Sequence, residues 1–193
     1  VPVVSSMIAV DIQTELDNYF GFIGAYGDRT ANFIVAKSDL VIAIGSRLDV
    51  SQVGAKRENF APDSKIFRID IDAGELEYKV HNDEVDIVAD SYLALQCICK
   101  EWSRIKPDYS SWRKTCGVIY KELHGHDDKN YNDFVRKISG LIGNNSVITT
   151  DVGQNQVWVA QSFDVKDGQR ILFSGGHGAM GYSLPAAIGA CIG

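Results

Sequence analysis

Short apolar runs, separated by polar stretches, recur through the first half of the chain. The run from Asp39 to Gly45 is almost continuously hydrophobic and ends in glycine, which is typical of a parallel strand covered on both faces. Residues 1–4, 65–72 and 84–90 contain further strand-like runs, and residues 31–37 predict a short helix. Strands that alternate with helices predict an α/β fold with open parallel sheets and flanking helices.

A longer helix is expected directly after the strand at 84–90. Its apolar residues recur at roughly helical spacing, at Leu93, Leu95, Ile98, Trp102 and Ile105. Ser91 is expected to cap this helix at its start. Pro107 is expected to end it, because proline lacks the N–H that a helix interior needs.

A polar stretch with weak periodicity follows, over residues 106–130, and we expect it to be a connector between two domains. Helical spacing then begins near Tyr131, and apolar runs at 147–153 and 170–173 predict two more strands. Ligands of open parallel sheets bind at the carboxyl ends of strands, so the residues that end these two strands become candidates for a site.

The predicted organisation is two incomplete α/β units. Residues 1–105 are expected to form a central domain that lacks its start, since the chain opens inside a strand. Residues 131–193 are expected to be the start of a second domain, truncated within a helix at Gly193. A chain of 193 residues is long enough for one or two domains.

Composition and charge narrow the classes of partner. Hydrophobic content of 45% and charged content of 23% are ordinary for a globular protein. A net charge of −6 argues against a broad nucleic-acid surface. No apolar run approaches the ~20 residues of a membrane span, and no signal peptide is visible. We therefore predict a cytoplasmic protein with neither nucleic acid nor membrane as a partner.

Cysteine and histidine residues give little sign of a metal site. The cysteines are Cys97, Cys99, Cys116 and Cys191, which we interpret as reduced thiols. His124 and His126 stand near them in the sequence, but the spacing matches no zinc pattern. A polar surface loop is the prediction for these two histidines.

The most informative segment is glycine-rich and follows the strand at 170–173. Gly176–Gly181 fits the pattern G-x-G-x-x-G of a dinucleotide-binding turn. In that motif the helix begins inside the glycine loop, whereas Pro185 would break a helix already under way. Proline suits a first turn, so a helix that starts near Ser183 is the prediction. The loop before it is then longer and lies across a ligand.

Two separated motifs resemble one enzyme family. Asp151–Gln161 and Ser174–Ala190 are similar, in order and spacing, to segments of the thiamine diphosphate-dependent enzymes of the acetolactate synthase group. Residues 1–100 resemble the central domain of the same group. The segments that carry this second resemblance are Gly21–Gly27, Ser38–Asp49 and Ile69–Asp72.

The resemblance implies a thiamine diphosphate site in the second unit. The Gly178 carbonyl and the Met180 backbone N–H would bind the aminopyrimidine, beside Gly176. The Met180 side chain would lie between the two rings of the cofactor and hold it bent, which suits an unbranched, adaptable side chain. The diphosphate would lie against the backbone and amide groups of a second segment, made of Val152, Gly153, Gln154 and Asn155.

His177 stands where the family tends to have an apolar residue, usually leucine. It is a catalytic candidate with Met180, because a histidine near neutrality can pass a proton to or from a substrate. A satisfied polar residue on a loop is the other interpretation. This departure from the family pattern leaves the exact reaction undecided.

The resemblance also raises the question of FAD in the central domain. Arg47 would contact the flavin diphosphate or ribitol, and Asp70 and Asp90 would approach the adenosine. Two departures weaken this interpretation, because Tyr26 replaces a usual histidine and Ser51 replaces a second arginine, which is a bidentate phosphate partner. FAD is therefore a weak alternative, and Arg47 is otherwise a structural residue at a sheet edge.

The predicted activity is that of a 2-keto acid decarboxylase or carboligase, working as a homodimer or homotetramer. Its Mg²⁺ ligands are expected outside this chain, so the 193 residues alone are predicted to be inactive. Two other hypotheses stand beside it. One is an NAD(P)-dependent oxidoreductase that uses the turn at 176–181, and the other is a non-catalytic α/β domain.

Overall fold

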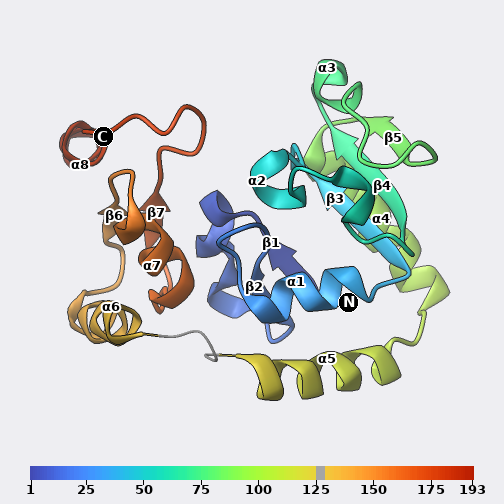
Figure 1. Ribbon diagram of the computed structural model, residues 1–193, viewed down its shortest axis with the longest axis horizontal. Helices are drawn as coiled ribbons and strands as arrows, with labels where there is room; N and C mark the ends of the chain where they lie inside the picture. Colours follow the sequence, from blue (N-terminus) through green and yellow to red (C-terminus); the bar gives the residue numbers. More distant parts are fainter. Residues whose placement is uncertain (125–128) are drawn as a thin grey trace. The chain divides into compact units, whose positions relative to one another are not determined.

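The structure is a computed structural model that describes residues 1–124 and 129–193, without the side chains of residues 13–15. Figure 1 shows its elements. The strands are β1 (Val3–Ser5), β2 (Tyr19–Phe22), β3 (Leu40–Ile44), β4 (Lys65–Asp70), β5 (Val85–Val88), β6 (Val147–Thr149) and β7 (Arg170–Leu172). The helices are η1 (Met7–Glu15), α1 (Arg29–Ala36), α2 (Val50–Val53), η2 (Arg57–Asn59), α3 (Ala73–Leu76), α4 (Ser91–Ile105), α5 (Ser110–Leu123), α6 (Asn130–Leu141), α7 (Gln154–Ser162) and α8 (Ser183–Ile192), with η1 and η2 of the tighter 3-10 type.

Every strand pair in the described part of the chain is parallel. The sheets have the strand orders β1–β2, β3–β4–β5 and β6–β7. The predicted α/β class with open parallel sheets is thereby confirmed. The chain divides into two compact units, one of residues 32–119 with Val1, and one of residues 2–31 with 120–193. Each unit is described by itself.

The first unit is built on the sheet β3–β4–β5. Part of its apolar side chains are buried, among them Ala43, Ile66 and Ile69. Arg68, on β4, is also fully buried, where its guanidinium donates to Glu84 at 3.0 Å and to the carbonyls of three further residues. Burial of this cation is tolerable because a carboxylate and backbone oxygens surround it.

The long helix of the first unit is where the sequence predicted it, with one correction. Asp90, and not Ser91, is its N-cap, since the Asp90 carboxylate accepts the Leu93 N–H at 3.0 Å. The helix ends at Ile105, and Lys106 turns left-handed with φ 49° just before Pro107. Asp and Ser cap helices about equally well, so the sequence alone does not decide between these two neighbours.

The predicted connector contains a regular helix, α5, which the sequence analysis missed. Its partly or fully buried positions include Trp112, Cys116 and Ile119, and Cys116 is completely buried. These positions are four and three residues apart, which is helical spacing. The many polar residues between them hid this short apolar stripe.

The second unit joins the N-terminal segment to the C-terminal part of the chain. One buried cluster contains residues of both parts, namely Val10, Phe22, Val135, Phe163 and Ile171. An ion pair between Arg170 and Asp11, at 2.7 Å, adds a polar contact between them. In the same unit, α6 and α7 pack together and share a buried bond from Asn132 to Ser162 at 2.7 Å. The paired strands thus present a fixed edge for the loops that follow them.

Candidate functional site

The glycine loop, residues 174–182, connects β7 to α8. The helix begins at Ser183 and Pro185 lies in its first turn, as the sequence predicted. Gly178 and Gly181 have φ of 63° and 87°, a region that side chains with a Cβ rarely adopt. The helix does not begin inside the glycines, so the loop lacks the geometry of a dinucleotide-binding turn.

Asp151 holds the far end of the glycine loop. It follows β6 directly, and its Oδ1 accepts the N–H of Val152 at 2.8 Å and of Gly181 at 2.9 Å. Its Oδ2 accepts the N–H of Ser183 at 3.3 Å. The bond from Gly181, followed by those from Val152 and Ser183, lowers the pKa of this carboxyl against a smaller opposing effect of desolvation. The carboxylate therefore stays ionised and keeps its three donors.

Two hydroxyl groups hold the remainder of the loop. The Ser174 Oγ accepts the Ala179 N–H at 3.0 Å, which closes the loop on itself. The Thr149 Oγ1 donates to the Ser183 carbonyl at 3.0 Å, and so ties the start of α8 to β6. At the start of the loop Gly175 lies against Ile8, whose side chain occupies the place a Cβ would take. The loop is fixed although it is mostly exposed.

The side chains that the sequence singled out on this loop point to open space. Met180 is 87% exposed, although methionine is usually a buried residue. His177 is exposed as well. Nothing lies within 4 Å of where a Cβ of Gly176 would stand. The loop therefore leaves open space around Met180 and Gly176.

The segment predicted to hold a diphosphate lies beside this loop. A Cβ on Gly178 would reach Val152 at 3.9 Å, and the bonds of Asp151 join the two segments. Gly153, with φ 141°, is the N-cap residue of α7 and supplies no side-chain cap, and Gln154 and Asn155 form the first turn. The structure thus brings Val152 next to Gly178 and places Gly153, Gln154 and Asn155 directly after it.

Two buried polar atoms flank this segment without a partner among residues 1–124 and 129–193. They are the Thr150 Oγ1 and the Gln156 Oε1. A buried hydroxyl or amide oxygen without a hydrogen bond costs about 1–3 kcal/mol, so such atoms are uncommon in folded proteins. Thr150 comes directly before residues 151–155 in the sequence, and Gln156 directly after them.

The carboxyl edge of β3–β4–β5, in the first unit, carries Arg47, Asp70 and Asp90. Arg47 forms an ion pair with Glu75 at 3.0 Å. Asp70 accepts the N–H of Asp72 at 3.0 Å, and Asp90 caps α4. These charged groups are all engaged by groups of the same unit.

The segment Gly21–Gly27, one of those that resemble the central domain, has three glycines, Gly21, Gly24 and Gly27, for which the structure gives a local reason. A Cβ on Gly21 would overlap the Asp28 carboxylate, and one on Gly27 would lie within 2.4 Å of the Phe22 carbonyl. Gly21 and Gly24 also have φ of 98° and 120°. Packing and backbone conformation within the second unit therefore account for them.

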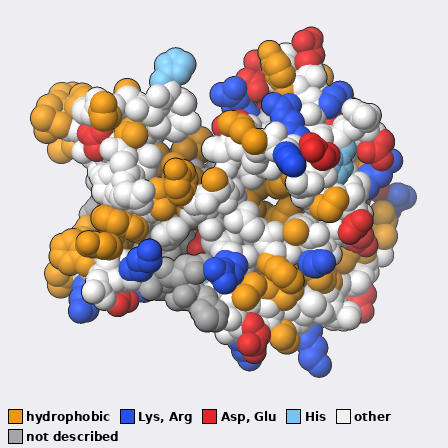
Figure 2. Space-filling view, in the orientation of Figure 1, with side chains coloured by type: hydrophobic (Ala, Val, Ile, Leu, Met, Phe, Trp, Pro, Cys, Tyr) orange, Lys and Arg blue, Asp and Glu red, His pale blue; other side chains and the backbone are white. Residues whose placement is uncertain are grey.

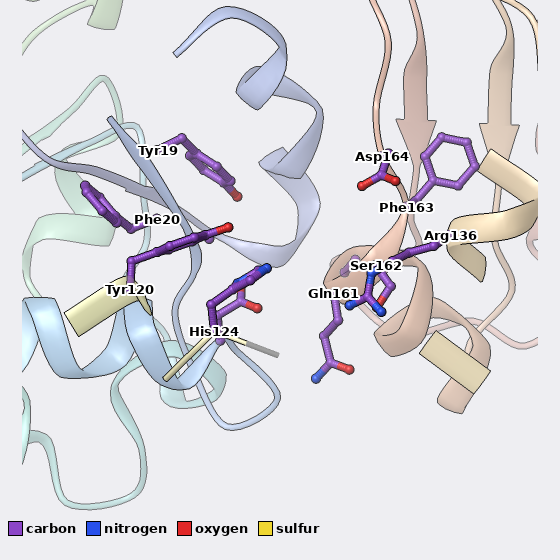
Figure 3. Close-up of a pocket in the computed structure, with 12 residues that line it drawn as sticks. Tyr19, Phe20, Tyr120, His124, Arg136, Gln161, Ser162, Phe163 and Asp164 are labelled. Carbon is purple, nitrogen blue, oxygen red and sulfur yellow. The ribbon is translucent and has the colours of Figure 1, made fainter. Parts of the chain in front are cut away.

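A separate cavity of about 160 Å³ lies in the second unit, away from the predicted cofactor residues. Figure 3 shows the aromatic side chains Tyr19, Phe20, Tyr120 and His124 on one side and Phe163, Asp164 and Arg136 on the other. Burial raises the pKa of both tyrosine hydroxyls, and the nearby Asp28 adds to this. The ring of His124 stacks on Tyr120 at 4.3 Å. Three lining residues, Gly21, Ala160 and Gln161, belong to segments that carry the family resemblance.

The histidine pair of the sequence analysis is described only in part, since His126 lies outside the described residues. Within the described ranges, no three or more His, Cys, Asp or Glu side chains are placed to hold a metal ion. Nor does any helix in those ranges have the length and hydrophobicity to cross a membrane.

Two sequence models of known families match the chain. The central domain of thiamine pyrophosphate enzymes matches residues 1–98, and their C-terminal thiamine pyrophosphate-binding domain matches residues 151–193. The chain belongs to the thiamine pyrophosphate enzyme family. The predicted family resemblance is confirmed, whereas the exact domain boundaries at residues 105 and 130 stay predictions.

Curated relatives of this thiamine pyrophosphate enzyme chain include acetolactate synthases. The chloroplastic acetolactate synthase 1 of Nicotiana tabacum is 37% identical over 100% of the chain and 30% of its own length. The isozyme 1 large subunit of Escherichia coli K12 is 35% identical over 89% of the chain and 31% of its length. The large subunit of Lactococcus lactis is 32% identical over 98% of the chain and 34% of its length. The chain thus spans about a third of these relatives.

The glycine loop leaves open space beside Met180, where a ligand has room at the carboxyl edge of β6–β7. At the other edge Arg47 already pairs with Glu75, so a flavin diphosphate would have to compete with this carboxylate. We derive no role for FAD.

Sequence reasoning missed one residue of the site, Asp151. It stood at the head of a quoted motif without a role of its own. An aspartate directly after a buried strand, at the edge where ligands bind, was the available signal. Its partners, Gly181 and Ser183, are about thirty residues away, and only the fold shows them together.

Proposed function

We propose that this chain supplies the cofactor-binding loops of a thiamine diphosphate-dependent 2-keto acid decarboxylase or carboligase of the acetolactate synthase type. The observation that carries the proposal is the ordered glycine loop, which exposes Met180 beside the strand-end segment that follows β6. The family match and the acetolactate synthase relatives support it. The relatives are about three times as long, so the activity belongs to the whole protein.

When bound, thiamine diphosphate supplies an electron sink for breaking the bond next to a keto carbonyl. The chain's own part is to bind and orient. The Gly178 carbonyl and the Met180 N–H would contact the aminopyrimidine, and the Met180 side chain would support its bent form. An exposed thioether of this kind can adapt to such a surface without disturbing a core.

The diphosphate would lie against Val152, Gly153, Gln154 and Asn155. The N-terminus of α7 points unsatisfied N–H groups out of the helix, and these favour a negatively charged group. Thr150, with its unpartnered hydroxyl, lies at the base of the same segment. Mg²⁺ would accompany the diphosphate with ligands from other parts of the whole protein.

His177 would face the substrate and move a proton, since its ring is exposed on the loop that holds Met180. The substrate class is a 2-keto acid. Assembly as a homodimer or homotetramer and a place in the cytoplasm complete the proposal. The matched tobacco protein carries a name that refers to the chloroplast, so location can differ among relatives.

The experiment is a titration of the chain with thiamine diphosphate and Mg²⁺, and separately with NADH, followed by the fluorescence of Trp158 on α7. We expect a saturable change with thiamine diphosphate alone. A saturable change with NADH that thiamine diphosphate does not displace would overturn the proposal in favour of an oxidoreductase. No response to either compound would favour a non-catalytic domain.

Activity is tested by replacing the matching segment of the Lactococcus lactis acetolactate synthase large subunit with this chain. We expect the chimera to consume pyruvate when thiamine diphosphate and Mg²⁺ are present. Met180→Ala in the same chimera should lower its rate. A folded chimera that binds thiamine diphosphate but does not consume any 2-keto acid would contradict the proposed activity.

A further inference from the structure

We propose that Asp151 is a positioning residue that sets the conformation of the glycine loop for cofactor binding. The inference rests on the proposed function, because the loop it fixes is the one that would hold the aminopyrimidine. It adds a residue that neither the family resemblance nor the sequence motifs had given a role.

The carboxylate of Asp151 reaches three backbone N–H groups. Its two oxygens accept backbone N–H groups of Val152, Gly181 and Ser183, at 2.8, 2.9 and 3.3 Å. These groups belong to three successive parts of the site: the strand-end segment, the glycine loop and the first residue of α8. A single side chain therefore joins the proposed diphosphate and aminopyrimidine contacts.

The hydrogen bond from Gly181 to Asp151 also fixes the orientation of one peptide unit in the glycine loop. The Gly181 N–H belongs to the peptide unit that links Met180 to Gly181, so its bond to Asp151 sets the direction of the Met180 carbonyl. Gly181 then turns the chain with φ 87° into Ser183, whose N–H meets the other oxygen. The backbone is thus held on both sides of the turn, while the Met180 side chain has no such restraint.

Aspartate suits position 151 better than asparagine does. An ionised carboxylate only accepts hydrogen bonds and has lone pairs for all three donors, whereas an amide offers one accepting oxygen and one donating nitrogen. Asparagine at this place would keep the bonds of one oxygen and present N–H₂ to the Ser183 N–H. The lowered pKa of Asp151, caused first by the Gly181 N–H, agrees with a charge-assisted contact.

The experiment compares Asp151→Asn and Asp151→Ala with the unchanged chain. Asp108→Asn is the matched control, because this exposed aspartate also accepts a backbone N–H, from Ser110 at 2.8 Å, and lies outside the site. Amide hydrogen exchange is measured at Gly181 and Ser183 without cofactor, thiamine diphosphate affinity by titration with Mg²⁺, and the unfolding midpoint by circular dichroism.

In Asp151→Ala we expect about tenfold faster exchange or more at both amides, since charge-assisted hydrogen bonds are lost, and a similar fall in affinity. In Asp151→Asn we expect faster exchange mainly at Ser183 and a smaller fall in affinity. The control should match the unchanged chain in both readouts, and unfolding midpoints should stay within a few degrees.

Unchanged exchange at Gly181 and Ser183 in both variants would overturn the positioning role. So would lost affinity that follows a general loss of stability in Asp151→Asn, where the side-chain shape is kept. A different result separates the two proposals: if the unchanged chain fails to bind thiamine diphosphate, while exchange at these amides responds as expected, the proposed function fails and the loop restraint stands.

Discussion

The two strand edges of this chain carry similar residues and differ in how their polar groups are used. At the edge of β3–β4–β5, Arg47 is paired with Glu75 and Asp90 caps a helix. At the edge of β6–β7, Asp151 orders a loop that exposes Met180, and the Thr150 hydroxyl lacks a partner among the described residues. The charged side chains that end the first sheet are engaged within their own unit, whereas the loop at the second edge presents an exposed apolar side chain. Buried polar atoms without a partner among the described residues occur in both units, at Arg68 and Asp86 as well as at Thr150 and Gln156.

This comparison of the two edges shows which features of a strand edge indicate a ligand site. Charged residues at the carboxyl ends of strands are a weak sign, because caps and ion pairs use the same residue types. A loop that hydrogen bonds hold in place while it exposes Met180 is a more specific sign. This is why we propose the cofactor site in the second unit.

The largest expected effect is a loss of stability when the buried ion pair between Glu84 and Arg68 is broken. Glu84→Gln removes the charge that faces the buried Arg68, and we expect it to lower the free energy of unfolding by about 3–5 kcal/mol. Urea denaturation measures this. The control is Glu101→Gln, which breaks the exposed pair with Arg104 and should cost about 0–1 kcal/mol. Equal costs for the two variants would mean that the buried pair does not organise this unit.

The buried Cys116 and the exposed Cys191 should differ in their rates of alkylation. Burial raises the pKa of Cys116, on α5, to about 11 from 9.0, so its thiolate is about a hundredfold scarcer at neutral pH. Cys191 lies exposed on α8. Timed alkylation at pH 7.5, read by mass spectrometry, should label Cys191 long before Cys116. Equal rates would show that α5 opens readily.

A flavin titration tests whether the first edge is truly satisfied. We expect no saturable binding of FAD at concentrations that saturate the chain with thiamine diphosphate. Arg47→Ala should cost about 0–1 kcal/mol of stability, as exposed ion pairs do, and leave thiamine diphosphate affinity unchanged. Tight FAD binding that Arg47→Ala abolishes would break the comparison between the edges.

The smallest expected effect is the change with pH of the hydrogen bonds that Asp151 accepts. The pKa of Asp151 is lowered in the folded chain, chiefly by the Gly181 N–H, so its stabilising bonds are fully present above the ordinary aspartate pKa. They are lost as pH falls through the lowered folded value. The nuclear magnetic resonance signals of Gly181 and Ser183 should therefore stay constant from pH 8 to pH 5 and shift only in stronger acid. A midpoint near neutrality would contradict this assignment.

Local patterns in the sequence were enough for much of the fold. The apolar run at Leu40–Ile44 predicted a parallel strand, and Pro185 placed the start of α8. Helix α5 was missed, because its stripe through Cys116 is narrow and its other faces are polar. A pattern read within a short window reports burial on one face, and it fails when that face is small.

The candidate site also contains residues that a short segment of sequence indicates and residues that it does not. The roles of Gly178 and Met180 come from the family resemblance, which two short segments of the sequence carry, and they remain predictions. The role of Asp151 and the lining of the cavity beside Tyr120 could not be predicted, since they depend on groups far apart in the sequence. Figure 2 shows hydrophobic side chains over α8, where Leu184, Ile188 and Ile192 are exposed.

The most direct test of the central claim is residue-resolved amide exchange of the chain with and without thiamine diphosphate and Mg²⁺. We predict slower exchange at residues 152–155 and 176–181, with no change around Arg47. Met180→Ala should weaken this protection while altering stability by less than about 0.5 kcal/mol, because the side chain is 87% exposed. Protection confined to the cavity beside Tyr120, or spread around Arg47, would contradict the assignment of the cofactor to the glycine loop.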